Sequence, residues 1–501
     1  MSLEVQVLMG KQEKLFDSTL LSKGFSGLGK TDDASAFDSF EQWQAWAEEE
    51  DARTGQFDWR EKDPSRHYDY RAVRRRYRRL KDLREEGNDR GLLFALHEGV
   101  HGNMGRMGNP NLYVRSKIGT KQLIEDYIDE ICLSLRHIHN VPDDVISVDE
   151  KWAFFDRVDN CFGRSALMLS GGAVLGYFHY GVVKAMFERN VLPNVISGSS
   201  AGSITAAVLG THSDRELKKV FGPERLLLDA EYEANFLQRL LKPHGDHMDS
   251  KEIADNIANL VPDLTFEEAF NKTGRHINIT VAPASKHQTS RLLNNITSPN
   301  VYIRSAVQAS CAVPGIYESV QLRAKNFKGG SEDYLPGRRW VDGSMDDDLP
   351  AKRLSRLYGV NHYIASQANP IVLPFVSHPE SKKFIDLVSR PYKAFAKESV
   401  KSWRGLANRL NIPVPRRMRL MADFFYQISM QKYTADITIM LNPRQVASLR
   451  LLSRPTAREV EALIRSGERA TWPLIYRIDL SMRISRTVQE VLSEYKLTDA
   501  A

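Results

Sequence analysis

Residues 198–202 combine residue types and a spacing that can perform nucleophilic chemistry. They read GSSAG, which fits G-x-S-x-G, and they follow an apolar run and precede a helix-compatible run. A strand, a tight turn and a helix in this order are typical of a nucleophile elbow, in which the middle serine projects from the edge of a sheet. Small flanking residues suit such a turn because the backbone folds back on itself. Ser200 is therefore the candidate nucleophile, and Gly198 and Gly202 are the candidate elbow glycines.

A second glycine-rich turn lies one crossover earlier, at residues 170–176 (SGGAVLG), between a predicted strand at 165–169 and a predicted helix at about 177–189. A dinucleotide loop is disfavoured because no acidic residue stands at a strand end about 20 positions on, and a P-loop is excluded because no Gly-Lys-Ser/Thr follows. Backbone N–H groups at such a turn stabilise negative charge. Beside a nucleophilic serine, that charge is the oxyanion of a tetrahedral intermediate.

Ser200 requires a base, because a hydroxyl is a poor nucleophile at its ordinary pKa. Asp342 ends a predicted strand and precedes Gly343, where site residues of an open α/β sheet lie, and its carboxylate could accept the proton directly. The alternative is a Ser-His-Asp triad that uses His362 or His378, both of which follow the serine in the chain.

Periodicity divides the chain into four parts. Residues 35–150 have a helical pattern and predict an all-α N-terminal domain. Strand and helix patterns alternate over 160–370 and predict an α/β catalytic domain with a mostly parallel sheet. Residues 1–34 are expected to form a loosely ordered leader, and 371–501 a mainly helical extension that packs on the catalytic domain.

Composition limits the classes of function. A net charge of +6 gives no strong indication of nucleic-acid binding, and three scattered cysteines fit neither a disulfide framework nor a zinc site. We therefore expect no metal, no cofactor and no nucleic-acid partner. The first residues lack the pattern of a signal peptide, and no run of about 18 apolar residues predicts a spanning helix. The expectation is a cytoplasmic protein whose contact with a membrane or lipid droplet, if any, is peripheral.

Two segments are strongly basic. Seven of the eleven residues at 71–81 are Arg or Lys, and 416–419 carries three further arginines. One interpretation of the first segment is a solvated helix face paired with Asp82, Glu85 and Glu86. The other is attraction to anionic lipid head groups, which also applies to the second segment.

Four segments resemble, in the same order, the motifs of the patatin-like phospholipases. They are residues 170–176, 198–202, 309–314 (ASCAVP) and 342–344 (DGS). The resemblance is closer still to the branch that includes the fungal and plant oil-body triacylglycerol lipases, in which a helical domain precedes the patatin module. It extends from about residue 40 to about residue 480.

The resemblance implies a patatin-like three-layer α/β fold with a mostly parallel central sheet. It also implies a Ser–Asp dyad, with Ser200 as nucleophile and Asp342 as base, followed by Gly343 of the acidic motif. The implied activity is that of a serine hydrolase that cleaves carboxylic esters of acylglycerols or phospholipids through an acyl-enzyme. A Ser-His-Asp esterase and a non-catalytic lipid-surface scaffold remain alternatives.

In this family, backbone donors equivalent to Gly171, Gly172 and Ala173 form the oxyanion hole. The chain departs from the family pattern at three positions. Ala173 replaces a common third glycine, which is tolerable if its φ is negative. Leu175 stands where many patatins place a cation, and Ser344 where Gly or Ala is usual.

Overall fold

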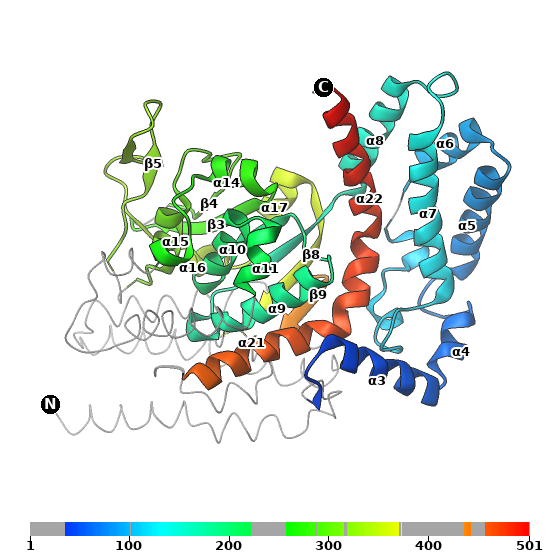
Figure 1. The fold of residues 1–501 in the computed structure, drawn as a ribbon, viewed down its shortest axis with the longest axis horizontal. Coiled ribbons are helices and arrows are strands. Elements are labelled where there is room, and N and C mark those ends of the chain that lie inside the picture. Colours follow the sequence, from blue (N-terminus) through cyan, green and yellow to red (C-terminus); the bar gives the residue numbers. More distant parts are fainter. Residues whose placement is uncertain are drawn as a thin grey trace, which may run out of the picture.

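The structure is a computed structural model. It describes residues 36–100, 102–221, 257–285, 288–314, 318–369, 372, 435–441 and 456–499. The predicted leader at 1–34, the basic segment at 416–419 and His378 lie outside these residues. Within them, a group of long helices stands beside a sheet with helices on both faces (Figure 1).

The N-terminal part is helical, as its periodicity predicts. Its helices are α3 (Phe40–Arg53), α4 (Gln56–Glu61), α5 (Tyr70–Glu85), α6 (Asp89–His97), α7 (Gln122–Asn140) and α8 (Val148–Phe162). Side-chain caps fix several starting points, for example Asp69, which accepts from the first free N–H groups of α5. The apolar stripe of α7 is buried, so this helix lies at the centre of the group.

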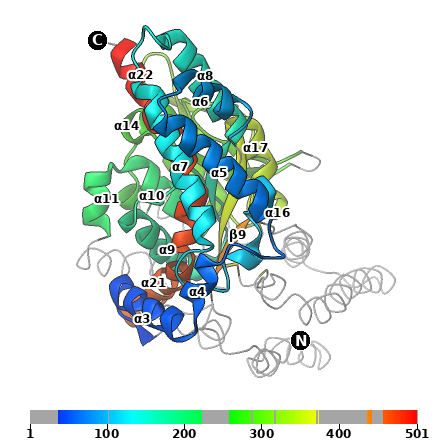
Figure 2. The same ribbon diagram turned by 90° about the vertical axis from the view of Figure 1, so that its right-hand side faces the viewer.

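The last helix, α22 (Ile475–Asp499), completes this helical group. Figures 1 and 2 both place it beside α7, and its residues Leu480, Ile484 and Val488 belong to the same core as the apolar stripe of α7. The sequence predicted that 371–501 would pack on the catalytic part. Within the described residues of this range, α21 (Ala457–Thr471) lies along α9 (Tyr177–Glu188) and a short strand pairs with the central sheet, whereas most of α22 lies against α7 and α8.

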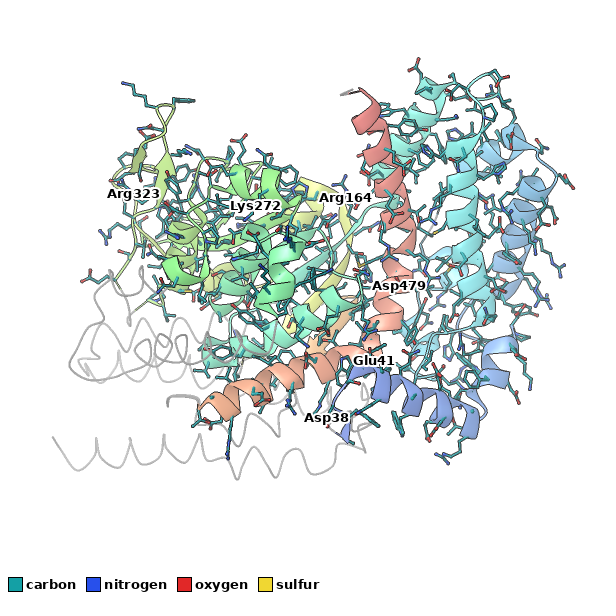
Figure 3. The ribbon with its side chains drawn as sticks, viewed as in Figure 1. Asp38, Glu41, Arg164, Lys272, Arg323 and Asp479 are labelled. Atoms are coloured by element: carbon teal, nitrogen blue, oxygen red, sulfur yellow. The ribbon has the colours of Figure 1, made fainter. Side chains whose placement is uncertain are left out.

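The first described helix, α3, packs in the core of the sheet region. Trp43 and Ala47 of α3 are buried in the core of the sheet region rather than in that of the helical group. Figure 3 labels Asp38 and Glu41, whose carboxylates pair with Arg469 of α21 and with Arg189 after α9. The two cores therefore share elements from both ends of the chain, and the domain limits given above remain predictions.

The central sheet is mixed and mostly parallel, which confirms the predicted fold class. Its strand order is β4-β3-β2-β1-β8-β9, with β7 paired to β3. The strands are β1 (Arg164–Leu169), β2 (Val195–Gly198), β3 (His276–Pro283), β4 (Arg291–Leu293), β7 (Trp340–Asp342), β8 (Val360–Gln367) and β9 (Ile437–Met440). Only β4 and β7 run antiparallel to their neighbour β3. A separate hairpin contains β5 (Arg323–Lys325) and β6 (Ser331–Asp333).

Alternation along β1 explains why both faces of the sheet are covered. Leu167 and Leu169 face a core shared with α9, α21 and α10 (Ala201–Thr211). Ala166 and Met168 face a smaller core on the other side, shared with α17 (Ala351–Tyr358). Side chains of period two therefore produce three layers.

Further helices surround the sheet: α11 (Asp214–Val220), α14 (Phe266–Thr273), α15 (Ile303–Cys311) and α16 (Ser344–Asp347). A capping box between Ser213 and Glu216 starts α11. No helix in the described part of the chain has both the length and the apolar character needed to cross a bilayer.

Helices α9 and α21 cross at two glycines. A Cβ on Gly181 would overlap the carbonyl oxygen of Ile464, and a Cβ on Gly467 would overlap that of Phe178. The obstructing atoms are backbone, which cannot rotate away. The crossing therefore depends on the absence of side chains at both positions.

We expect Gly467→Ala to lower the free energy of unfolding by at least about 2 kcal/mol, because the added methyl must push the two helices apart. Denaturant unfolding followed by circular dichroism measures this change. Ala462→Leu, on the exposed side of the same helix, is the matched control and should change stability little. Equal stability of the Gly467→Ala variant and the unsubstituted chain would contradict the close crossing.

Candidate active site

Parallel pairing brings the two glycine-rich turns together. Leu169 at the end of β1 is paired with Gly198 at the end of β2. The turn after β1 and the elbow after β2 therefore leave the sheet at the same edge. A Cβ placed on Gly171 would lie 3.5 Å from the Cβ of Ser200.

The backbone around Ser200 has the features that the G-x-S-x-G pattern predicts. Ser200 has φ 49° and ψ −122°, a strained conformation for a residue with a side chain. A Cβ on Gly198 would overlap the carbonyl oxygen of Gly202, and one on Gly202 would overlap that of Leu169. Both positions therefore require glycine, and the serine is held on a sharp turn between β2 and α10.

The C-terminal end of α15 joins the serine to the aspartate. The N–H of Ser200 donates to Ser310 Oγ at 2.9 Å, and this hydroxyl donates to the carbonyl oxygen of Thr280 at 2.8 Å. Two residues on, the carbonyl oxygen of Ala312 accepts from the N–H of Asp342 at 2.9 Å. The sequence singled out residues 309–314 only as a family motif and did not predict this bridging role.

Asp342 ends β7 opposite Val281 of β3 and is 1% exposed. Its Oδ1 accepts from the N–H of Ser344 at 2.8 Å. Burial raises the pKa of this carboxyl group to about 6, while hydrogen bonding by Ser344 and Ser200 acts in the opposite direction. Oδ2 is buried and makes no hydrogen bond of regular geometry with the described residues. Asp342 thus has one oxygen fixed and one available near the serine.

Gly343 permits this placement of the aspartate. A Cβ there would lie 2.5 Å from the carbonyl carbon of Thr280, so a side chain would displace β7 from β3. Ser344, which follows, is buried and begins α16.

The turn after β1 differs from the prediction at Gly171. Its N–H donates to Asp348 Oδ1 at 2.8 Å, so this group is already satisfied and is not free for an oxyanion. No described residue accepts a hydrogen bond from the N–H of Gly172 or Ala173. The three predicted donors are therefore reduced to two.

The backbone at Ala173 also differs from the expectation. The methyl group was considered tolerable if φ were negative, but φ is 48°. Ala173 begins a short 3-10 helix, Ala173–Gly176, that leads directly into α9, and this sharp entry imposes the left-handed conformation. An L-residue there stores strain of about 1 kcal/mol. Leu175 in the same turn is fully buried and brings no charge to the site.

Two protein-family models match parts of this chain. The family model described as patatin-like phospholipase matches residues 167–354, and a model described as a domain of unknown function (DUF3336) matches 31–160. A patatin-like phospholipase domain-containing protein of Neosartorya fischeri is 30% identical, over 91% of this chain and 67% of that protein. The chain belongs to the patatin-like phospholipase family.

Two relatives within this family have names that state an activity. Triacylglycerol lipase 4 of Saccharomyces cerevisiae is 34% identical over 87% of this chain, and triacylglycerol lipase SDP1L of Arabidopsis thaliana is 34% identical over 85%. The chain spans about half the length of these curated relatives, 50% and 54% respectively. Among solved structures, VipD from Legionella pneumophila is 16% identical over 65% of this chain and 67% of that chain, with a TM-score of 0.31. That similarity adds nothing to the assignment.

In this patatin-like chain, His362 lies away from the sheet edge that carries Ser200. His362 of β8 is paired with Ser165 of β1, four positions before the Leu169–Ser366 pair at the site edge. At about 3.3 Å per residue, the imidazole lies about 13 Å along the sheet from that edge. Its Nδ1 contacts Ser165 Oγ at 3.0 Å. The triad through His362 is therefore not supported.

His179 of α9 has a structural role beside the glycine-rich turn after β1. It is fully buried, and burial lowers its pKa to about 4, so the ring is neutral. Nε2 lies 2.9 Å from the carbonyl oxygen of Ser170, which can only accept, so Nε2 carries the proton. Nδ1 then accepts from Ser366 Oγ at 2.7 Å. This histidine fixes the start of the turn.

Asp348 and Ser310 are the site residues that sequence reasoning missed. Asp348 lies in the run DDDLP at 346–350, six positions after Asp342. An acidic residue directly before Leu-Pro, close behind a site aspartate, was the available indication, but nothing in the local pattern shows that its side chain turns inward.

We expect the rate at which a fluorophosphonate labels Ser200 to rise about tenfold between pH 5 and pH 7, because only ionised Asp342 can accept the serine proton and its pKa is about 6. Labelling reactions quenched at successive times and analysed by intact-mass spectrometry measure this rate. The Asp342→Asn variant should label slowly and show no such rise. A wild-type profile that is flat from pH 5 to 7 would remove Asp342 from the role of base.

Proposed function

We propose that this chain is a serine lipid acyl hydrolase that cleaves carboxylic esters of acylglycerols or phospholipids through an acyl-enzyme. One observation carries the proposal: a serine on a strained elbow and a buried carboxyl group are bound to the same short segment, 310–312, beside two backbone N–H groups that donate to no described residue. Family membership and the names of the two lipases support the same class of reaction.

The proposed reaction follows from this arrangement. Ser200 Oγ attacks the acyl carbonyl while Asp342 Oδ2 takes its proton. The N–H groups of Gly172 and Ala173 stabilise the oxyanion, and the alcohol leaves with the proton returned by Asp342. Asp342 then activates a water molecule, which releases the fatty acid and restores the serine.

The pKa of Asp342 suits both proton transfers. An aspartate of ordinary pKa is a weak base at neutral pH, whereas one raised by burial to about 6 is mostly ionised at pH 7 and still binds a proton readily. No positively charged group is needed in the turn, because the donors are backbone N–H groups. Neither proton transfer calls for a metal or a cofactor.

We expect Ser200→Ala and Asp342→Asn each to reduce fatty-acid release at least about 1,000-fold, because each removes a group that the chemical step requires. The measurement is release of fatty acid from triacylglycerol, phosphatidylcholine and lysophosphatidylcholine by the purified chain. Circular dichroism verifies that both variants remain folded.

Two histidine variants serve as controls for the alternative triad. His362→Gln and His378→Gln should each retain activity within about threefold, since the proposed dyad uses no imidazole. Loss of activity in either variant, together with persistence in Asp342→Asn, would favour the Ser-His-Asp mechanism. If no fluorophosphonate labels Ser200 of the unsubstituted chain, the alternative of a non-catalytic lipid-surface scaffold is favoured.

We further propose that the outer face of α5 binds anionic lipid surfaces. The acidic residues predicted to pair with this helix neutralise little of its charge, since Lys81 and Glu85 are 3.9 Å apart. Instead Arg74 pairs with Asp63, and Arg76 and Arg79 pair with Glu98, at 2.7 and 2.9 Å. The cations that remain point outward on one face, without a carboxylate within ion-pair distance among the described residues: Arg71, Arg75 and Arg78.

Replacing Arg71, Arg75 and Arg78 with glutamine should weaken binding to phosphatidylserine vesicles about 100-fold, because each near-surface cation contributes about 1 kcal/mol. Vesicle sedimentation at fixed ionic strength measures the affinity. Hydrolysis of a soluble short-chain ester should stay unchanged.

The matched control changes the same number of charges on arginines that already have carboxylate partners: Arg53 with Glu50, Arg90 with Glu150 and Arg136 with Glu490. This triple glutamine variant should bind the vesicles nearly as well as the unsubstituted chain. An equal loss in both triple variants would show that total charge, and not the face of α5, controls binding.

A further inference from the structure

Asp348 connects the three segments that form the site. Its Oδ1 accepts from the N–H of Gly171 at 2.8 Å, and its carbonyl oxygen accepts from Ser199 Oγ at 3.0 Å. It follows α16, the helix that begins two residues after Asp342. One residue thus holds the oxyanion turn with its side chain and the elbow with its main chain.

The surroundings of this carboxyl group disfavour its ionised form. Asp348 is fully buried, and burial raises its pKa to about 8, opposed by hydrogen bonds from Gly171 and Asn369. The nearby carboxylates of Asp342 and Asp347 raise the pKa further. Two buried carboxyl groups in one site do not both ionise readily. Near neutral pH, Asp342 is therefore the charged member and Asp348 the neutral one.

The oxyanion turn needs an anchor of this kind. Ala173 holds a left-handed φ of 48°, and such strain persists only where surrounding contacts fix the backbone. On one side of the turn, His179 binds the carbonyl oxygen of Ser170. On the other side, the N–H of Gly171 donates to Asp348 Oδ1 at 2.8 Å.

We propose that Asp348 is the positioning residue of the oxyanion hole: its carboxyl group fixes Gly171 and thereby directs the N–H groups of Gly172 and Ala173 toward Ser200. The inference rests on the proposed function. Asp348 takes no proton from substrate in this scheme, because Oδ1 is bound to the turn and the serine proton goes to Asp342. A negative charge at Asp348 would oppose the oxyanion that the same turn must stabilise.

The first test compares two substitutions at position 348. Asp348→Asn keeps an oxygen that accepts from Gly171 and cannot ionise, so kcat at pH 7 should stay within about threefold. Asp348→Ala leaves that buried N–H without an acceptor, so kcat should fall about 100-fold with KM little changed, as on loss of an oxyanion donor. If Asp348→Asn is as impaired as Asp348→Ala, the inference is wrong.

The second test is the pH profile, which a merely structural role would not alter. Wild-type kcat should decline above pH 8 as Asp348 ionises, and Asp348→Asn should remove this decline. Persistence of the decline in Asp348→Asn would overturn the inference. This result stays distinct from failure of the proposed function, in which the unsubstituted chain releases no fatty acid and Ser200 resists labelling.

Asp51 supplies the matched control for lost stability. It is a carboxylate of 1% exposure in α3 that accepts from the N–H groups of Lys117 and Ile118 at 3.0 Å, in a different part of the fold. Asp51→Ala should lower the thermal midpoint yet leave kcat per folded molecule and the pH profile unchanged. If Asp51→Ala lowers kcat as much as Asp348→Ala, general destabilisation explains both.

Discussion

In-register parallel pairing of β1, β2 and β3 is the constraint on which the site depends. Because Leu169, Gly198 and Ile279 stand side by side, the segments that follow β1 and β2 leave the sheet at one edge. A slip of one residue would turn each side chain to the other face of the sheet and would separate the elbow from the glycine turn. The antiparallel β7 then returns along β3 and delivers Asp342 to the same edge.

Strain is concentrated at two residues of this edge, Ser200 and Ala173, which both have positive φ. Residues in such conformations cost about 1–3 kcal/mol each and persist only when their neighbours hold them in place. Here the holding groups are neutral: the hydroxyl of Ser310, the imidazole of His179 and the carboxyl group of Asp348. Neutral hydrogen bonds add no charge that would compete with the developing oxyanion, whereas an ion pair at the same place would alter the field in which the serine reacts.

Local sequence patterns predicted much of this chain, but they failed where contacts between residues far apart in the sequence determine the structure. The elbow, the glycine turn and β7 each combine a short apolar run with small residues, and that information lies within a few positions. The strand β9 was missed because four residues, Ile437–Met440, become a strand only by pairing with β8. The inward turn of Asp348 and the left-handed φ of Ala173 were also beyond reach, since the first depends on Gly171 and the second on the entry into α9. The sequence of α22 likewise did not indicate which core its apolar residues would join.

The crossing of α9 and α21 has a consequence for the order in which the protein matures. The helix α9, which follows the glycine-rich turn after β1, packs against α21. That helix begins at Ala457, almost 300 residues further along the chain. When β1 to β8 have been synthesised, α21 has not yet been made, nor has α22, which fills the helical core. The turn after β1 in a nascent chain therefore lacks this support until α21 has been synthesised.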